Sequence, residues 1–287
     1  MPEGVERQHL TLRGRHFRWG TRTYIMGVLN VTPDSFSDGG DFIAPQAALA
    51  QAQQLEAAGA DFIDLGGEST RPGAPPVTAT TERDRVLPVL QAVRAAVSAP
   101  ISIDTRRAAT ARAAVAAGAD LVNDVSGGRF DADMLPTVAQ LGVPIVLTHS
   151  RGTPETMQQL TDYADPVGEI YRELQACLER ATRAGVPHSH LIADPGIGFA
   201  KDDGQNLALL RHANAFGALG VPLLVGASRK GFIGRLLDRG DPKARDWGTA
   251  AACCAAIAGS ADILRVHEVA SLRDVCRVAD AIWRAGE

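Results

Sequence analysis

The chain has 287 residues, of which 45% are hydrophobic and 22% charged, and its formal net charge is −4. This length fits one large domain or two small ones, and the composition is ordinary for a soluble globular enzyme. The slightly acidic balance argues against a general nucleic-acid-binding surface, so no nucleic-acid partner is expected.

The N-terminal segment is polar and charged, and it lacks the apolar region typical of a signal peptide. No apolar run reaches the ~20 residues that a membrane-spanning helix needs, so no membrane partner is expected. The four cysteines form no CxxC pair and are interpreted as small buried residues rather than as a zinc site. A reducing, cytoplasmic location is therefore predicted.

Residues 9–19 alternate polar and apolar side chains around Gly14, which predicts a β-hairpin that plugs one end of the fold. From Tyr24 onward the pattern changes to alternating strands and helices. No linker, low-complexity run or change of composition separates the two parts. We therefore assign residues 1–23 to an N-terminal segment of the same domain, and residues 24–287 to its main body.

One sequence pattern occurs three times in this main body. It consists of a helix end, a glycine suited to a left-handed cap, a short turn and a buried strand. The three strands end at Asp64, Asn123 and Arg265. Repetition of the unit predicts alternating helices and strands, and the polar strand ends predict that several side chains converge in one place.

Short strands, apolar on both faces, are predicted at Ile25–Leu29, Phe62–Asp64, Ile101–Asp104, Leu121–Asn123, Ile145–Thr148, Leu191–Asp194, Leu223–Val225 and Ile263–Arg265. Helices are predicted at Gln46–Ala58, Glu82–Val97, Arg107–Ala117, Met134–Leu141, Pro166–Ala184, Asn206–His212, Arg245–Ala258 and Ser271–Ala285. This alternation predicts an α/β fold, a single (β/α)₈ TIM barrel with a short N-terminal β-hairpin. A doubly wound sheet is the alternative, although no GxGxxG motif follows the first strand.

In such a barrel the active site lies at the carboxyl ends of the strands and in the loops that follow them. Two of these loops, residues 30–40 and 66–76, are longer than a simple connection needs. Carboxylates, amides and a lysine at the strand ends suit a flat heterocycle with amino and carbonyl edges, and cations suit a phosphate. The candidates are Asn30, Arg71, Asp104, Asn123, Asp194, Lys230, Arg265 and His267.

Simpler structural roles compete with these assignments. Asp104 and Asp194 could cap the following helices, and Asn123 could satisfy a turn. For His149, a hydrogen-bonded core histidine and a ligand-binding histidine are equally supported. Arg229 and Lys230 at a helix start oppose the helix dipole, which favours a ligand-binding role for them. A buried Arg265 is costly unless it is paired, so it too favours function.

The two long loops and the strand ends resemble those of the dihydropteroate synthases, a pterin-binding TIM-barrel family of folate biosynthesis. The similar segments are residues 26–40 and 64–73, followed in family order by the strand ends at 103–105, 122–125, 194–199, 228–230 and 265–267. The similarity runs from about Tyr24 to the end. The two loop segments are the most specific of these matches.

The resemblance implies a transferase that joins 6-hydroxymethyl-7,8-dihydropterin diphosphate to 4-aminobenzoate, with Mg²⁺, giving 7,8-dihydropteroate and pyrophosphate. It implies catalytic roles for Asp104, Asp194, Lys230 and Arg265, and pterin binding by these residues and Asn123. The diphosphate would be bound by Asn30, Thr70, Arg71, Arg265 and His267, with Asn30 also placing the metal. The aminobenzoate would be bound by Phe36, Thr70, Arg71, Pro72, Phe199, Ser228 and Lys230.

Two residues depart from the family pattern: Thr148 stands where Met is usual, and Glu268 where Asp is usual. The alternatives are therefore a non-catalytic pterin-binding paralogue and a pterin-dependent methyltransferase, although both long loop segments are intact. The resemblance also implies a homodimer, for which the Ala-rich C-terminal helices could supply the interface. Asp64 is interpreted as a structural acid, or as one that supports the ligand-binding residues, beneath the loop that carries Thr70 and Arg71.

Overall fold

The computed structural model describes residues 9–31, 40–71, 73–74 and 76–284, with the backbone alone for residues 40–44. Its main sheet has 8 parallel strands in the order β8-β7-β6-β5-β4-β3-β10-β9. The strands are β3 (Tyr24–Asn30), β4 (Phe62–Gly66), β5 (Ile101–Asp104), β6 (Leu121–Asp124), β7 (Ile145–Thr148), β8 (Leu191–Asp194), β9 (Leu224–Val225) and β10 (Ile263–Val266).

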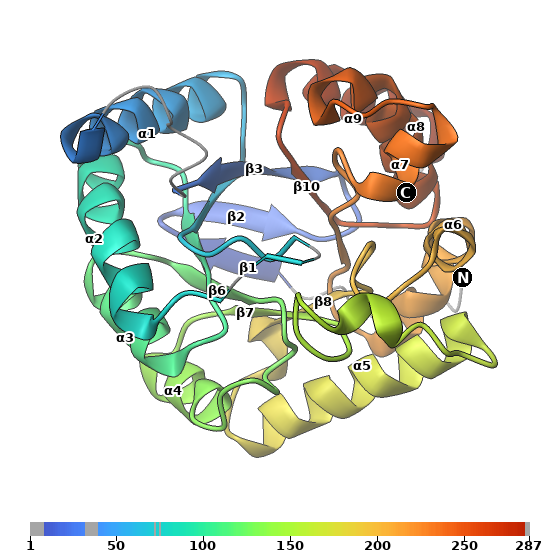
Figure 1. Ribbon diagram of the computed structural model, residues 1–287, viewed down its shortest axis with the longest axis horizontal. Coiled ribbons are helices and arrows are strands. Elements are labelled where there is room, and N and C mark those ends of the chain that lie inside the picture. Colours follow the sequence, from blue (N-terminus) through green and yellow to red (C-terminus); the bar gives the residue numbers. More distant parts are fainter. Residues whose placement is uncertain (1–8, 32–39, 72, 75, 285–287) are drawn as a thin grey trace.

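The two edges of this sheet meet. The Ala193 amide of β8 donates to the Pro222 carbonyl at 2.9 Å, and Ala193 pairs with Leu223 in a parallel bridge beside β9. Closure of the sheet confirms the predicted barrel and rules out the doubly wound alternative. Helices surround the barrel in chain order (Figure 1).

The helices in the described part of the chain are α1 (Gly40–Ala57), α2 (Ala79–Ala96), α3 (Ala108–Ala116), α4 (Met134–Leu141), α5 (Pro166–Arg183), α6 (Asp203–Arg211), α7 (Gly231–Leu236), α8 (Asp246–Ala258) and α9 (Val269–Trp283). Short 3₁₀ segments lie at Met157–Gln159, His188–His190, Ala213–Leu219 and Pro242–Arg245. The helix α7 was not predicted, because its glycines, Gly231 and Gly234, lower helix propensity. None of the described helices is both long and apolar enough to cross a membrane.

Side chains of a strand alternate between the two faces of the sheet, so every second residue points into the barrel. At the amino ends of the strands these inward residues form one buried layer, which is apolar apart from Ser102 of β5. The layer contains Met26, Phe62, Leu121, Val146, Ile192, Leu224 and Ile263. We call it the barrel floor. The outward residues pack against the helices in a separate, larger core.

The predicted hairpin is present and covers the floor. Its strands β1 (His9–Leu12) and β2 (Arg15–Arg18) join at Arg13 and Gly14, whose φ angles of 49° and 74° suit a tight hairpin turn. Phe17 is 1% exposed and stacks on Phe62 of the floor, with ring centroids 4.4 Å apart. The hairpin therefore plugs the end of the barrel opposite the predicted site.

Charged side chains between Asp262 and Arg284, near the end of the barrel sequence, hold this plug in place. Asp262 accepts a hydrogen bond from the Gly20 amide at 2.8 Å. Asp280 of α9 accepts from the Thr23 amide and hydroxyl at 2.8 and 2.7 Å. Arg284 donates to the Gly20 carbonyl at 3.0 Å. The segment after the hairpin is thus tied to the C-terminal elements.

Candidate active site

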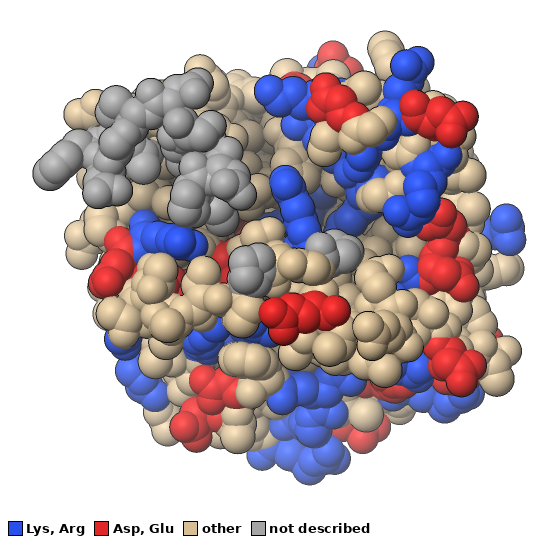
Figure 2. Space-filling view, in the orientation of Figure 1, with Lys and Arg blue, Asp and Glu red and all other residues tan. Residues whose placement is uncertain are grey.

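In several strands the next inward-facing residue, two positions after the apolar floor, is polar. Phe62 is followed by Asp64, and Ile263 is followed by Arg265. The full polar layer comprises Asp64, Asp104, Asn123, Thr148, Asp194 and Arg265. The predicted convergence of strand ends therefore arises from the two-residue period of the strands. Figure 2 shows this face of the molecule, with Lys and Arg side chains around its central hollow.

Arg265 lies between two carboxylates of this layer. Its Nε donates to Asp64 at 2.6 Å, and its Nη2 donates to Asp104 at 2.9 Å. Asp64 is 0% exposed and Asp104 is 7% exposed. Burial, together with the nearby Asp64, raises the pKa of Asp104 to about 7, although the charge of Arg265 opposes the rise. Asp104 is thus a carboxyl group that titrates near neutral pH.

Asn123 pairs in register with Asp104 on the neighbouring strand and is 2% exposed. Its Nδ2 donates to Asp64 Oδ2 at 3.2 Å. Its Oδ1 is buried and has no hydrogen-bond partner. A buried acceptor without a partner is costly in a folded protein, so this oxygen is available to a donor on a ligand.

Asp194 is held at the end of β8 by two hydrogen bonds. Its Oδ1 accepts from the Gly196 amide at 2.8 Å, and its Oδ2 accepts from the Thr148 hydroxyl at 3.2 Å. Burial raises the pKa of Asp194, while these hydrogen bonds and Lys230 oppose the rise. Gly196 has a φ of 71°, and a Cβ there would lie 1.9 Å from the His149 carbonyl oxygen, so the turn requires glycine.

Lys230 is the cation that faces these acceptors. It is the residue immediately before α7, and its Nζ lies 4.1 Å from the centroid of the Phe199 ring. Burial lowers the pKa of Lys230 to about 8, helped by Arg265, while Asp194 and Asp104 oppose the shift. Gly198 makes room for it, because a Cβ at that position would lie 3.0 Å from Lys230 Cδ.

The contacts of Arg229 indicate a structural role and not ligand binding. It adopts a left-handed backbone conformation with a φ of 58°. Its guanidinium pairs with both oxygens of Asp246 at 2.7 and 2.8 Å, and its amide donates to Thr249. This fixed, strained backbone sets the position from which Lys230 enters the site.

His267 and Ser228 meet at the carboxyl ends of β10 and β9. The Ser228 hydroxyl and His267 Nδ1 are 3.0 Å apart, and the His267 amide donates to the same hydroxyl. Burial and the charges of Arg265, Arg229, Arg71 and Lys230 lower the pKa of His267 to about 3. His267 is therefore a neutral imidazole near pH 7, surrounded by cations that suit an anion.

The predicted loop residues are only partly described. Asn30 ends β3 half-buried, and no described residue forms a hydrogen bond with its side chain. Thr70 is half-buried and Arg71 is exposed in the loop after β4. Phe36 and Pro72 lie outside the described residues. The structure therefore places the pterin-side candidates together, and it leaves part of the aminobenzoate side untested.

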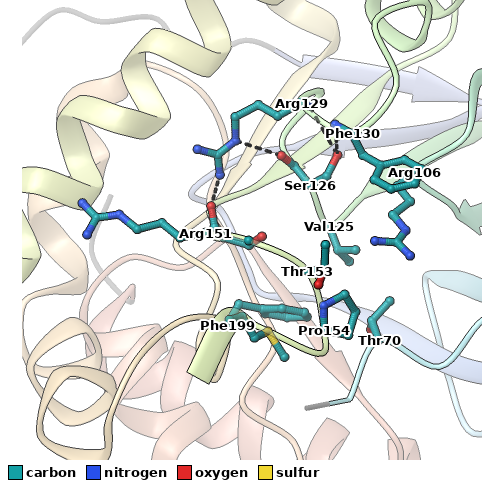
Figure 3. Close-up of a pocket in the computed structure, with 13 residues that line it drawn as sticks. Thr70, Arg106, Val125, Ser126, Arg129, Phe130, Arg151, Thr153, Pro154 and Phe199 are labelled. Atoms are coloured by element: carbon teal, nitrogen blue, oxygen red, sulfur yellow. Dashed lines mark hydrogen bonds between the residues drawn. The ribbon is translucent and has the colours of Figure 1, made fainter. Parts of the chain in front are cut away.

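A cavity of ≈470 Å³ lies beside the polar layer, among the loops that follow β4 to β8. Thr70, Val125 and Phe199 line it together with Arg106, Arg129 and Phe130 (Figure 3). The charged residues of the polar layer are not part of its lining. The cavity meets the polar layer at Phe199, whose ring also contacts Lys230.

The structural interpretation of His149 is supported. His149 is 0% exposed, its Nε2 contacts Glu173 at 3.0 Å, and its Nδ1 contacts Lys201 Nζ at 3.0 Å. Lys201 also donates to the Phe199 carbonyl at 2.7 Å. Burial lowers the pKa of His149 to about 4. This buried network fixes the loop that carries Phe199, although nothing in the sequence analysis singled out Lys201.

Asp64 contacts two residues of the predicted site. It lies in the polar layer and accepts hydrogen bonds from Arg265 and Asn123, the position of an acid that supports ligand-binding candidates. Its position two residues after Phe62 was the signal that could have placed it there. Asp104 and Asp194 show the same relation to Ser102 and Ile192.

Comparisons with known proteins agree with this geometry. The sequence profile of a family described as "Pterin binding enzyme" matches residues 26–267. A dihydropteroate synthase of Synechocystis sp. is 54% identical over 268 residues, which cover 93% of this chain and 93% of the relative.

Solved structures give the same result. Xanthomonas albilineans dihydropteroate synthase with 4-aminobenzoic acid has a TM-score of 0.89 and 42% identity, covering 96% of this chain and 98% of that chain. The same enzyme in complex with 7,8-dihydropteroate has a TM-score of 0.86 and 40% identity, with 96% and 98% coverage. The chain therefore belongs to the pterin-binding enzyme family, among its dihydropteroate synthases.

Proposed function

We propose that this chain joins 6-hydroxymethyl-7,8-dihydropterin diphosphate to 4-aminobenzoate, giving 7,8-dihydropteroate and pyrophosphate. The observation that carries the proposal is the polarity of the inner layer. Asp104, Asn123 and Asp194 offer acceptors, and Lys230 is a donor that faces them. A dihydropterin has a matching pattern, with N–H groups along its amino edge and acceptors at O4 and N5.

The reaction breaks the bond between the pterin methylene carbon and the diphosphate oxygen, and it forms a carbon–nitrogen bond to the arylamine. The bond electrons leave with pyrophosphate, and the amine proton is lost after the new bond forms. Asp104 and Asp194 at the amino edge favour the electron-poor methylene that develops. Arg265, Arg71 and His267 bind the departing diphosphate, so positioning and charge stabilisation supply much of the rate.

Binding of the diphosphate would release Arg265 from Asp104. In this structure Arg265 neutralises Asp64 and Asp104, so the amino edge of the pterin and Arg265 compete for Asp104. We infer that Arg265 turns toward the diphosphate and stacks on the pterin ring as the substrate enters. Arg265 would thereby couple recognition of the two ends of one substrate.

A magnesium ion is expected with the diphosphate, and the residues present fit one. Mg²⁺ in phosphate sites is usually held by one or two protein oxygens, the substrate phosphates and water. The amide oxygen of Asn30 would be such a ligand, and no described residue forms a hydrogen bond with its side chain. The described residues contain no cluster of three or more His, Cys, Asp or Glu side chains for a protein-only metal cage. The bound ion would neutralise charge on the diphosphate.

The aminobenzoate would lie between Phe199, Ser228 and Lys230 on one side and the long loops on the other, with Thr70, Arg71, Phe36 and Pro72 contributing from those loops. Phe199 supports this arrangement, because its ring connects the cavity to Lys230. The amine would then approach the methylene carbon from the face opposite the diphosphate.

We further propose a cytoplasmic homodimer. The four cysteines are all free, as expected in a reducing compartment. Large apolar side chains are exposed on α7 and α8, where Leu236 is 57% exposed and Trp247 is 88% exposed. Such a patch is unusual for the surface of a monomer.

The function is tested by pyrophosphate release from the purified chain with both substrates and Mg²⁺. We expect release that depends on 4-aminobenzoate and is inhibited competitively by sulfonamides. Pterin binding without release would instead favour the non-catalytic paralogue. Binding of methyltetrahydrofolate and methyl transfer to a corrinoid partner would favour the methyltransferase. No turnover by well-folded protein would contradict the proposal.

A further inference from the structure

Asp64 holds a central position in the polar layer, although none of the roles above requires it. It is 0% exposed, it lies on β4, and its Oδ2 accepts from both Arg265 Nε at 2.6 Å and Asn123 Nδ2 at 3.2 Å. Asp64 thus contacts one pterin-binding candidate from β6 and another from β10.

The chemistry of this contact fixes the orientation of the Asn123 amide. The oxygen and nitrogen of an asparagine amide are nearly the same size, so hydrogen-bond partners decide which way it faces. A carboxylate paired with a guanidinium can only accept hydrogen bonds. Asn123 must therefore turn its nitrogen toward Asp64, and this leaves its oxygen, Oδ1, as the atom available to a ligand.

The rest of the layer agrees with this polarity. Asn123 Oδ1 is buried without a partner. Asp104, its neighbour in register, and Asp194 at the carboxyl end of β8 are further acceptors of the polar layer. Asp64 thereby adds Asn123 Oδ1 to the acceptors of this layer, in which Arg265 and the Thr148 hydroxyl are donors.

We propose that Asp64 is a positioning residue that sets the ligand selectivity of Asn123. By binding the amide nitrogen, it makes Asn123 accept a hydrogen bond from an N–H donor of the pterin and reject a ligand that presents an acceptor there. The inference rests on the proposed function, because it assigns the pterin as the ligand.

Besides its N3–H group, a dihydropterin has two N–H donors that Asn123 could contact. One is the 2-amino group. The other is N8–H, which becomes an unprotonated acceptor when the ring is oxidised. An amide held with its oxygen toward the ligand would discriminate against whichever analogue loses the donor that it contacts.

The test measures the dissociation constants of three ligands by anaerobic calorimetry. They are 6-hydroxymethyl-7,8-dihydropterin, its oxidised form without N8–H, and the 2-oxo analogue without the amino group. Asp64→Asn keeps the size of the side chain but can offer Asn123 either an acceptor or a donor. The amide of Asn123 can then rotate and present its nitrogen.

We expect Asp64→Asn to reduce the preference for the dihydropterin over one of the two analogues by about tenfold, the scale of one hydrogen bond. The analogue affected identifies the donor that Asn123 contacts. The control is Glu82→Gln, since Glu82 is also 0% exposed and hydrogen-bonded, to Arg107 and Thr110. It should leave both preferences unchanged. Equal weakening of all three ligands by Asp64→Asn would overturn the proposal.

A second variant keeps the proposal testable if Asp64→Asn does not fold. Asn123→Asp removes the nitrogen that faces Asp64 and keeps an acceptor toward the ligand. We expect it to retain the preference for the donor-bearing pterin, although affinity falls. Loss of that preference would mean that the amide nitrogen faces the ligand, which contradicts the proposal. If the wild-type chain binds no pterin, the proposed function fails, independently of the role of Asp64.

Discussion

The two ends of the barrel interior are built from the same strands but have opposite chemistry. At the floor, Phe62, Ile192 and Ile263 pack under the hairpin in an apolar layer. Two residues further along the same strands, Asp64, Asp194 and Arg265 form a buried polar layer. One step of the strand period therefore separates residues that stabilise the fold from residues that we propose form or support the substrate-binding site. Substitutions in the two layers should have separable effects.

The largest loss of stability should come from a substitution at the floor. Phe17→Ala removes a ring that is 1% exposed and stacked on Phe62, so we expect a loss of ~3–5 kcal/mol in the free energy of unfolding. Urea denaturation measures this loss. The kcat/KM of the folded enzyme should stay within about twofold of wild type, because the site lies at the other end. A large drop in kcat/KM for folded protein would contradict the separation.

Lys230→Ala should have the opposite result, a large loss of activity without a loss of stability. Loss of the charged donor should reduce kcat/KM by about 100-fold, the scale of a lost hydrogen bond from a charged group. Thermal stability should be unchanged or higher, because the buried Lys230 carries a desolvation cost. Pyrophosphate release and the unfolding midpoint measure the two quantities. Unchanged pterin binding by calorimetry would remove Lys230 from the site.

The pH dependence of kcat/KM should reflect Asp104 of the polar layer and Lys230 beside it, and not the floor. Asp104, with its pKa raised to about 7, is protonated on the acid side, where it loses its negative charge and is a weaker acceptor for the substrate. Lys230, with its pKa lowered to about 8, loses its charge on the alkaline side. We therefore expect a bell-shaped profile with its maximum between these values.

Lys230→Arg tests which group produces the alkaline limb. Arginine remains charged throughout this range, so the fall above about pH 8 should disappear even if the maximal rate is lower. Phe17→Ala should leave the shape of the profile unchanged. An alkaline limb that persists in Lys230→Arg would assign that limb to another group.

The smallest expected effect concerns Thr148, which differs from the residue usual in the family. Its hydroxyl donates to Asp194 and opposes the rise of the Asp194 pKa. We expect Thr148→Val to raise the KM for the pterin diphosphate about three- to tenfold, with the KM for 4-aminobenzoate unchanged. Thr148→Ser should restore the wild-type value. Equal changes in both KM values would show a general distortion of the site instead.

The strand ends were predictable because a polar residue that closes a short apolar run is conspicuous. The face on which each one lies was harder to predict. Asn123 and Asp124 are adjacent, but only Asn123 faces the barrel interior; Asp124 instead accepts from the amides of Ser126 and Gly128 in a turn. Because of the same uncertainty, Asp64 was given a supporting role but was not placed in the polar layer.

Other features depended on contacts that sequence does not reveal. The ion pair between Arg229 and Asp246 joins residues 17 positions apart in the sequence. Lys201 follows a glycine-rich loop and resembles a surface lysine in the sequence, yet it is 2% exposed and bonded to His149. Such long-range pairs depend on how the loops pack, which local patterns do not specify.

The ties between the hairpin segment and the last elements also bear on how the molecule is assembled. Gly20 and Thr23 find their partners on Asp262 and Asp280, and β3 finds one of its two neighbours in β10. A nascent chain emerging from a ribosome would expose the hairpin and β3 well before the elements that carry their partners. We therefore expect ring closure to be a late step that waits for the C-terminal helix. Until then the early strands would depend on chaperones to shield their unpaired edge.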